Sequence, residues 1–249
     1  MNPVQFVMPK PDEAIVEKWI KLAMEIIITR GITNIHDAWQ DPTTVKVLQQ
    51  LSETGKLPIR IYGMLGSSHP KLLKHFFKEG IFRSEKYNIR SVKAFIDGAL
   101  GSRGAALLEP YCDDINNCGL ILISEKEFKD LAKRCRDANF QLCTHAIGDK
   151  GNKMVLDIYS KTITSSINHR WRIEHAQMVS NEDVPKTMAQ VVESLRSDAL
   201  RVAMDMGIEE LLHERGKTKL MDEMKKSTFQ RWSNMPKISI VKATKSVER

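Results

Sequence analysis

The spacing of apolar residues predicts helices that alternate with short strands from Asp12 to Pro185. Apolar residues recur at helical intervals after Asp12 and after Asp41, and aspartate is a residue type that caps helix N-termini. A further helix begins after Ser124, which forms a capping box with Glu127. In chain order the expected elements are helix 12–31, strand 32–38, helix 41–51, strand 57–65, helix 69–82, strand 89–96, helix 125–138, strand 140–145, a helix after Asp149 and strand 170–176.

Strands that alternate with helices favour a parallel sheet built from βα units. About five such units correspond to half to two-thirds of an eightfold barrel. We therefore expect the α/β class, with a partial (β/α)8 TIM-type barrel over residues 1–186. The Gly- and Asp-rich stretch 97–119 interrupts the alternation, and a loop of that length in a compact domain is usually a lid or a binding loop.

The pattern changes after Pro185. Between Lys186 and Phe229 the apolar residues keep helical spacing in a polar background, and no β-prone run ends on a residue that could bind a metal. We predict that residues 187–249 form a second region, a helical and basic C-terminal segment of unclear origin. We interpret the arrangement as a truncated or chimeric chain, in which open edges of the partial barrel favour oligomers.

Composition adds limits on compartment and partners. The 249 residues are 42% hydrophobic and 28% charged, ordinary values for a globular protein with a buried core. The net charge of +7 is spread along the chain and aromatic residues make up only 6%, which argues against a nucleic-acid-binding surface. The four cysteines form no CxxC pair, and we find neither a leader nor an apolar run of about 20 residues. We expect a reduced, cytoplasmic protein that does not enter membranes.

Three side chains able to bind a metal stand at or near the ends of expected strands: Lys93, His145 and His175. In a parallel barrel the C-terminal ends of the strands share one face, so these side chains could converge on one site. Each signal is weak alone, since a histidine at a strand end is more often a hydrogen-bonded structural residue. Lys93 is less usual, because an ammonium in an apolar strand must either reach the barrel rim or lose its charge.

Three sequence runs carry a resemblance to a known family: VKAFIDGALGSRGAALLEPY at 92–111, THAIGDKGN at 144–152 and RIEHAQMVSNEDVP at 172–185. Together they resemble the amidohydrolase family 3 group of the metal-dependent amidohydrolase superfamily, which includes YtcJ-like proteins and N-substituted formamide deformylases. The similarity covers about residues 14–185. It implies a (β/α)8 barrel enzyme in which one or two divalent metal ions, usually zinc, promote hydrolysis of C–N bonds in small non-peptide amides or formamides.

The resemblance also implies roles for individual residues. Lys93 is then the lysine that reacts with carbon dioxide to give a metal-bridging carbamate, and His145 and His175 are further metal ligands. Asp149 could orient His145 from behind, although a helix cap explains it equally well. The residues expected to shape the substrate pocket, or to serve only the turns of their loop, are Asp97, Gly98, Ser102 and Arg103.

Two parts of the family's metal site have no counterpart in the sequence. None of the seven histidines stands two residues from another, so the chain has no HxH pair. No aspartate after Pro185 matches the one that the family places on its eighth strand, so no catalytic residue is assigned. Glu174 and His36 are expected to have mainly structural roles.

Three functions are therefore compared. The first is a metal-dependent C–N hydrolase acting on a small-molecule amide, with activity impaired by the missing HxH pair and eighth-strand aspartate. The second is a non-catalytic amidohydrolase remnant or chimera with a structural or interaction role. The third, a nucleic-acid-associated chimera, is the least favoured because the C-terminal segment alternates its charges and has few aromatic residues.

Overall fold

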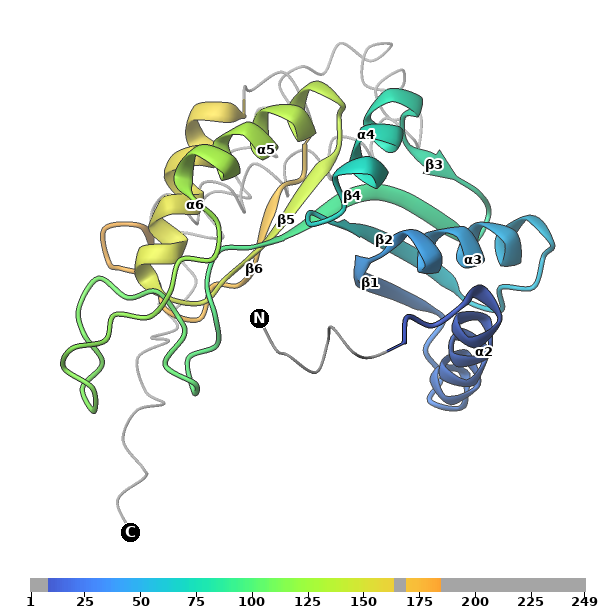
Figure 1. Ribbon diagram of the computed structural model, residues 1–249, viewed down its shortest axis with the longest axis horizontal. Coiled ribbons are helices and arrows are strands. Elements are labelled where there is room, and N and C mark those ends of the chain that lie inside the picture. The colour runs from blue at the N-terminus through green and yellow to red at the C-terminus, as the bar shows by residue number, and fades with distance from the viewer. Residues whose placement is uncertain (1–8, 164–168, 185–249) are drawn as a thin grey trace, which may run out of the picture. The chain divides into compact units, whose positions relative to one another are not determined.

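The computed structural model describes residues 9–163 and 169–184 of the chain, which are built on a six-stranded sheet (Figure 1). Five strands run parallel in the order β1-β2-β4-β5-β6, and the short β3 pairs antiparallel with β4. The strands are β1 Asn34–Gln40, β2 Arg60–Gly66, β3 Phe82–Arg83, β4 Tyr87–Phe95, β5 Gln141–Ala146 and β6 Arg172–His175.

Helices connect successive parallel strands, as a βα-repeat fold requires. The five helices of the described ranges are α2 Glu13–Thr29, α3 Pro42–Glu53, α4 Pro70–Glu79, α5 Glu125–Asp137 and α6 Asp149–Thr162. Each of them contributes buried side chains to one hydrophobic core that it shares with the sheet. The chain thus forms the parallel strands and helices of a partial TIM-type barrel, and the predicted fold class is confirmed.

The helix ends follow from local side-chain chemistry. Asp12 and Asp41 cap α2 and α3 by accepting hydrogen bonds from backbone N–H groups three residues later, both at 2.8 Å. Ser124 and Glu127 form the predicted capping box at the start of α5. Gly31 and Gly55 follow the last residues of α2 and α3 with positive φ angles of 72° and 68°, which glycine adopts without strain.

One predicted element ends earlier than expected. The helical pattern suggested a helical stretch from 69 to 82 that Gly80 interrupts. The helix α4 ends at Glu79, directly before this interruption, and Gly80 takes a φ of 93°. The following residues, Phe82 and Arg83, pair with Ile89 and Asn88 of β4 to form β3. Two residues are too few for a periodic strand signal, so apolar Phe82 was counted with the preceding helix.

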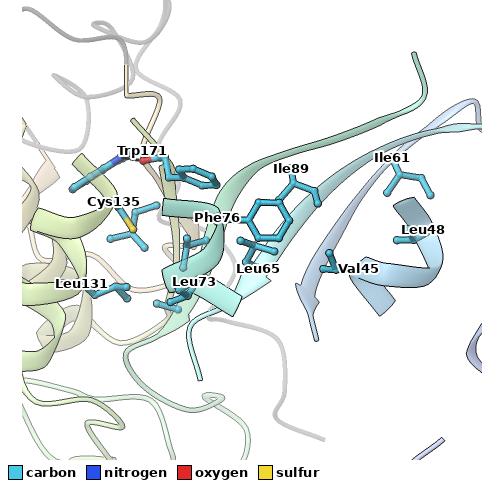
Figure 2. Packing of buried hydrophobic residues seen from close by; sticks show 14 of the residues in the cluster. Val45, Leu48, Ile61, Leu65, Leu73, Phe76, Ile89, Leu131, Cys135 and Trp171 are labelled. Atoms are coloured by element: carbon cyan, nitrogen blue, oxygen red, sulfur yellow. Dashed lines mark hydrogen bonds between the residues drawn. The ribbon is translucent and has the colours of Figure 1, made fainter. Parts of the chain in front are cut away.

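The core lies between the helices and the outward face of the sheet. Figure 2 shows Leu73 and Phe76 of α4 among buried residues of the neighbouring strands, including Leu65 and Ile89. Complete burial of a side chain of this size stabilises a fold by about 1.5–3 kcal/mol. One set of side chains on each strand packs in this core. Because successive side chains of a strand point to opposite faces, the side chains between them point to the inner face of the partial barrel.

Several predictions fall on residues outside the described ranges. The boundary near residue 186 and the helical, basic segment 187–249 lie there, and both stay predictions. Association through open sheet edges and a cytoplasmic location also stay predictions.

Within residues 9–163 and 169–184, none of the helices is long and apolar enough to cross a membrane.

Candidate functional site

The sheet register brings the three predicted metal-binding positions to neighbouring strands. Lys93 of β4 lies beside Cys143 of β5, and His145, two residues further along β5, lies beside Phe95 of β4. His175 is the last residue of β6 and pairs with Ala146. All three positions lie in the C-terminal halves of parallel strands, the part of a barrel where active sites are built.

Lys93 and His145 lie against the ring of Phe95, and His175 lies against His145. Lys93 Nζ lies 4.8 Å from the centroid of that ring, and the centroid of the His145 ring lies 5.0 Å from it. The rings of His145 and His175 meet edge to face, with centroids 4.7 Å apart. The structure therefore brings one amine and two imidazoles into a single cluster on the inner face.

Lys93 is held in an environment that disfavours its charge. Its side chain is buried, with only 4% of the residue exposed. Burial lowers the pKa of its amine, although the nearby Glu174 and Cys143 act in the opposite direction. A lowered pKa increases the fraction of neutral amine, which is the form that can react with carbon dioxide.

His145 is also biased toward its neutral form. Burial lowers its pKa, the neighbouring His175 lowers it further, and the carboxylate of Asp97 opposes both effects. Its Nε2 atom is buried and has no hydrogen-bond partner in the described ranges. Neutral imidazole is the form in which histidine binds metals.

His175 is placed by an unusual backbone conformation. It is exposed, and its φ angle is 79°, followed by 43° at Ala176. Residues other than glycine rarely adopt positive φ because their Cβ atoms collide with the backbone. The turn is held by a hydrogen bond from the Ala176 N–H to the Ala146 carbonyl, at 3.1 Å. This turn places the His175 ring against the His145 ring. The two positive φ angles strain the backbone of the turn.

Asp97, predicted to shape the pocket, is a buried anchor. Its carboxylate accepts hydrogen bonds from the backbone N–H groups of Ala106, Ile147 and Gly148, at 2.9, 3.0 and 2.8 Å. These partners belong to the long loop after β4 and to the β5–α6 turn. One carboxylate therefore ties both segments to the end of β4, and its Oδ1 atom lies 3.5 Å from His145 Nε2.

The remaining predicted pocket residues make contacts inside the long loop. Gly98 donates its N–H to the Gly104 carbonyl at 2.9 Å, and Ser102 Oγ donates to the Ala99 carbonyl at 3.2 Å. Arg103 is exposed and pairs with the carboxylate of Asp113 through Nε and Nη2, at 3.0 and 2.8 Å. These contacts support turn roles for Ser102 and Arg103. Gly98 directly follows the buried Asp97 in the chain.

Asp149 contacts the long loop. Its Oδ1 atom accepts the N–H groups of Leu108 and Lys150, both at 2.8 Å. The N-cap residue of α6 is Gly148, so Asp149 is the first residue inside the helix. Of these two aspartates, Asp97 has its carboxylate next to the imidazole of His145.

Sequence reasoning missed a polar layer beneath this cluster. Arg172 Nε donates to Glu174 Oε1 at 2.7 Å on β6, and Arg172 Nη2 donates to His36 Nδ1 at 3.2 Å. Tyr62 of β2 adds a ring contact to His36, with centroids 4.9 Å apart. The signal was the two-residue spacing of Arg172 and Glu174, which puts both side chains on the same face of β6.

The donor set can be compared with what a metal requires. Among the described residues, no three His, Cys, Asp or Glu side chains lie close enough to hold a metal ion together. A centre at this cluster would therefore need Lys93 as a carbamate, or ligands from residues outside the described ranges. The lowered pKa values of the His145 imidazole and the Lys93 amine fit such a centre, because both shifts favour the neutral forms.

Comparison with known proteins gives the family. The sequence model that describes the amidohydrolase family matches residues 2–235 of this chain. The chain belongs to the amidohydrolase family. This match continues past the predicted boundary near residue 186, and the boundary itself stays a prediction.

This amidohydrolase-family chain has curated relatives in plants and bacteria. It is 29% identical over 212 residues to Protein LONG AFTER FAR-RED 3 of Arabidopsis thaliana, covering 77% of this chain and 36% of the relative. It is 26% identical over 180 residues to the putative amidohydrolase YtcJ of Bacillus subtilis, covering 70% and 33%. The chain therefore spans about a third of the length of these relatives.

A solved structure shares the fold of this family member. The crystal structure of an uncharacterized metal-dependent hydrolase from Pyrococcus horikoshii matches with a TM-score of 0.66 and 26% sequence identity. The match covers 72% of this chain and 36% of that protein. The resemblance to YtcJ-like amidohydrolases is confirmed, and the partial barrel corresponds to about a third of a longer hydrolase.

Proposed function

We propose that this chain is a metal-dependent hydrolase of C–N bonds in small, non-peptide amides or formamide-like compounds. In this proposal Lys93, as a carbamate, joins His145 and His175 in holding one or two divalent ions, with zinc as the expected metal. The observation that carries the proposal is the cluster around Phe95. There, a buried amine of lowered pKa and two adjacent imidazoles share the C-terminal side of a parallel sheet.

A bound divalent metal would lower the pKa of a water molecule toward about 7 and polarise the carbonyl group under attack. The chain's own residues would hold that metal. Lys93 contributes once its neutral amine has captured carbon dioxide, because a carbamate carries oxygen donors like a carboxylate. His145 contributes as neutral imidazole, the form that its burial favours.

The loop after β4 would form the wall of the substrate pocket. Its position depends on Asp97 at one end and Asp149 at the other, because both carboxylates accept N–H groups from the loop. Gly98, Ser102 and Arg103 lie between these anchors in the chain. We propose that they shape the pocket through the loop conformation, with a small-molecule amide as the partner in a cytoplasmic setting.

A non-catalytic family member is the second candidate. It is favoured by the absence of an HxH pair from the sequence and of any three-residue His, Cys, Asp or Glu metal site from the ranges that the structure describes. Under this proposal the partial barrel has a structural or interaction role, and association through open sheet edges would matter more than turnover. The polar inner layer of Arg172, Glu174 and His36 would then act only in stability.

Metal content distinguishes the two candidates. The full chain is incubated with zinc and bicarbonate, desalted and analysed for bound metal, together with Lys93→Ala and His145→Ala variants. Lys126→Ala serves as the control, because Lys126 is exposed on α5. The hydrolase proposal expects near-stoichiometric zinc that is lost in the first two variants only, and hydrolysis of at least one member of an amide and formamide panel. A wild-type protein that folds but retains no metal would overturn it.

A further inference from the structure

The buried carboxylate of Asp97 has a geometry that goes beyond anchoring a loop. Asp97 stands two residues after Phe95, and Phe95 lies beside His145 in the sheet register. Only 1% of Asp97 is exposed, and its two oxygens already accept three backbone N–H groups. A carboxylate held in this way cannot rotate freely, so the direction from its Oδ1 atom to His145 is fixed by the fold.

The Oδ1 atom of Asp97 lies close to the Nε2 ring nitrogen of His145. His145 Nε2 lies 3.5 Å from Asp97 Oδ1, and the same Nε2 is buried without a hydrogen bond from or to any described residue. The separation is slightly longer than an ordinary hydrogen bond.

The chemistry of the two groups decides where the ring proton sits. Neutral imidazole carries one N–H donor and one acceptor nitrogen, and an ionised carboxylate can only accept. If the lone pair of Nε2 faced Asp97, two acceptors would meet in a buried site, which is unfavourable. The proton therefore belongs on Nε2, and the lone pair on Nδ1.

We propose that Asp97 is a positioning residue that fixes His145 as the Nε2–H tautomer and leaves Nδ1 as its metal-binding atom. This is the carboxylate–histidine–metal arrangement, in which the partner behind the ring sets its tautomer and orientation. The metal-binding part of the inference rests on the proposed function, whereas the tautomer belongs to the metal-free protein. The Asp97 carboxylate also accepts the N–H groups of Ala106 and Gly148. The same side chain would therefore position both the long loop and the His145 ring.

The first experiment reads the tautomer directly. The metal-free full chain, labelled with 15N in its histidines, is studied by long-range 1H–15N NMR near pH 8, where histidine is neutral. A His145→Gln variant assigns the signal. The inference expects the Nε2–H tautomer in the wild type, and Nδ1–H in the wild type overturns it.

The Asp97→Asn variant tests the cause. An asparagine amide can keep one oxygen as an acceptor and place its NH2 group against His145, which favours a lone pair on Nε2 and the Nδ1–H tautomer. Asp149→Asn is the matched control, because Asp149 also accepts two N–H groups and also anchors the long loop. The inference expects the tautomer to change in Asp97→Asn only. A folded Asp97→Asn protein that keeps Nε2–H overturns it.

Zinc titration separates this inference from the proposed function. Loss of an orienting partner typically weakens metal binding by about 10- to 100-fold, so Asp97→Asn should bind zinc that much more weakly than the wild type and Asp149→Asn. Equal zinc affinity in the wild type and Asp97→Asn overturns the positioning role. If the wild type binds no zinc, the proposed hydrolase function fails, and the tautomer measurement still decides the role of Asp97.

Discussion

Arg172 of β6 donates a hydrogen bond to His36 of β1, although these strands stand at the two ends of the parallel strand order. The sheet must therefore curve enough for a side chain on its last strand to reach its first strand across the inner face. Glu174 holds the same guanidinium through Nε, at 2.7 Å. The inner face of the partial barrel is thus crossed by a polar hydrogen bond, where complete barrels pack mainly branched apolar residues.

Replacement of Arg172 by methionine tests this contact. The variant keeps much of the side-chain volume but leaves Glu174 and His36 without their shared partner. We expect the free energy of unfolding to fall by about 0.5–1 kcal/mol in urea titrations, because His36 is exposed and the Arg172 and Glu174 side chains are partly exposed. Lys133→Met on α5 is the control, since Lys133 is exposed. Equal losses in both variants would contradict a stabilising role for the contact.

His169 provides a prediction for pH dependence. It is 3% exposed, and neither ring nitrogen has a hydrogen-bond partner within the described ranges. Burial lowers its pKa from 6.5, and Arg136 and Arg90 lower it further. The unfolded chain therefore takes up a proton near pH 6.5 while the folded protein does not, so stability is lost as the pH falls below that value.

His169→Phe should remove this part of the pH dependence. Phenylalanine retains an aromatic contact with Trp171, whose ring centroid lies 5.4 Å from that of His169. We expect the variant to lose less stability than the wild type between pH 7 and about pH 5, measured by urea unfolding at each pH. Parallel pH profiles for the two proteins would show that His169 does not titrate on unfolding.

Gly148 offers a steric test of the loop attachment. A Cβ atom at this position would collide with the backbone carbonyl group of Ala106, which lies in the long loop. Gly148→Ala should therefore cost about 1–3 kcal/mol of stability and increase proteolysis of the loop. Gly101→Ala is the control, because a Cβ there meets nothing within 4 Å and should change stability by less than about 0.5 kcal/mol. Similar behaviour of the two variants would contradict the close approach.

Local signals in the sequence were sufficient for most of the fold. The caps at Asp12, Asp41 and Ser124 act within three residues, and each lies where its helix was expected to begin. The β3 pairing was missed because two residues carry no periodicity. The clustering of Lys93, His145 and His175 followed from strand ends meeting at one face of a parallel sheet.

The contacts that surround those residues were not predictable in the same way. Asp97 and His145 are 48 residues apart in the chain, and their proximity depends on the register of β4 and β5, which places Phe95 beside His145. The sequence suggested either orientation of His145 or a helix cap for Asp149, and it suggested only a pocket or turn role for Asp97. Arg172 and His36 are 136 residues apart, and only the curvature of the sheet brings them together.

The two successive positive φ angles at His175 and Ala176 strain the backbone at the end of β6. Glycine adopts such angles without strain, so Ala176→Gly should raise the thermal midpoint by relieving the backbone. The same substitution would widen the range of orientations open to the neighbouring imidazole. Alanine at this position therefore lowers stability but narrows the orientations that the His175 ring can take.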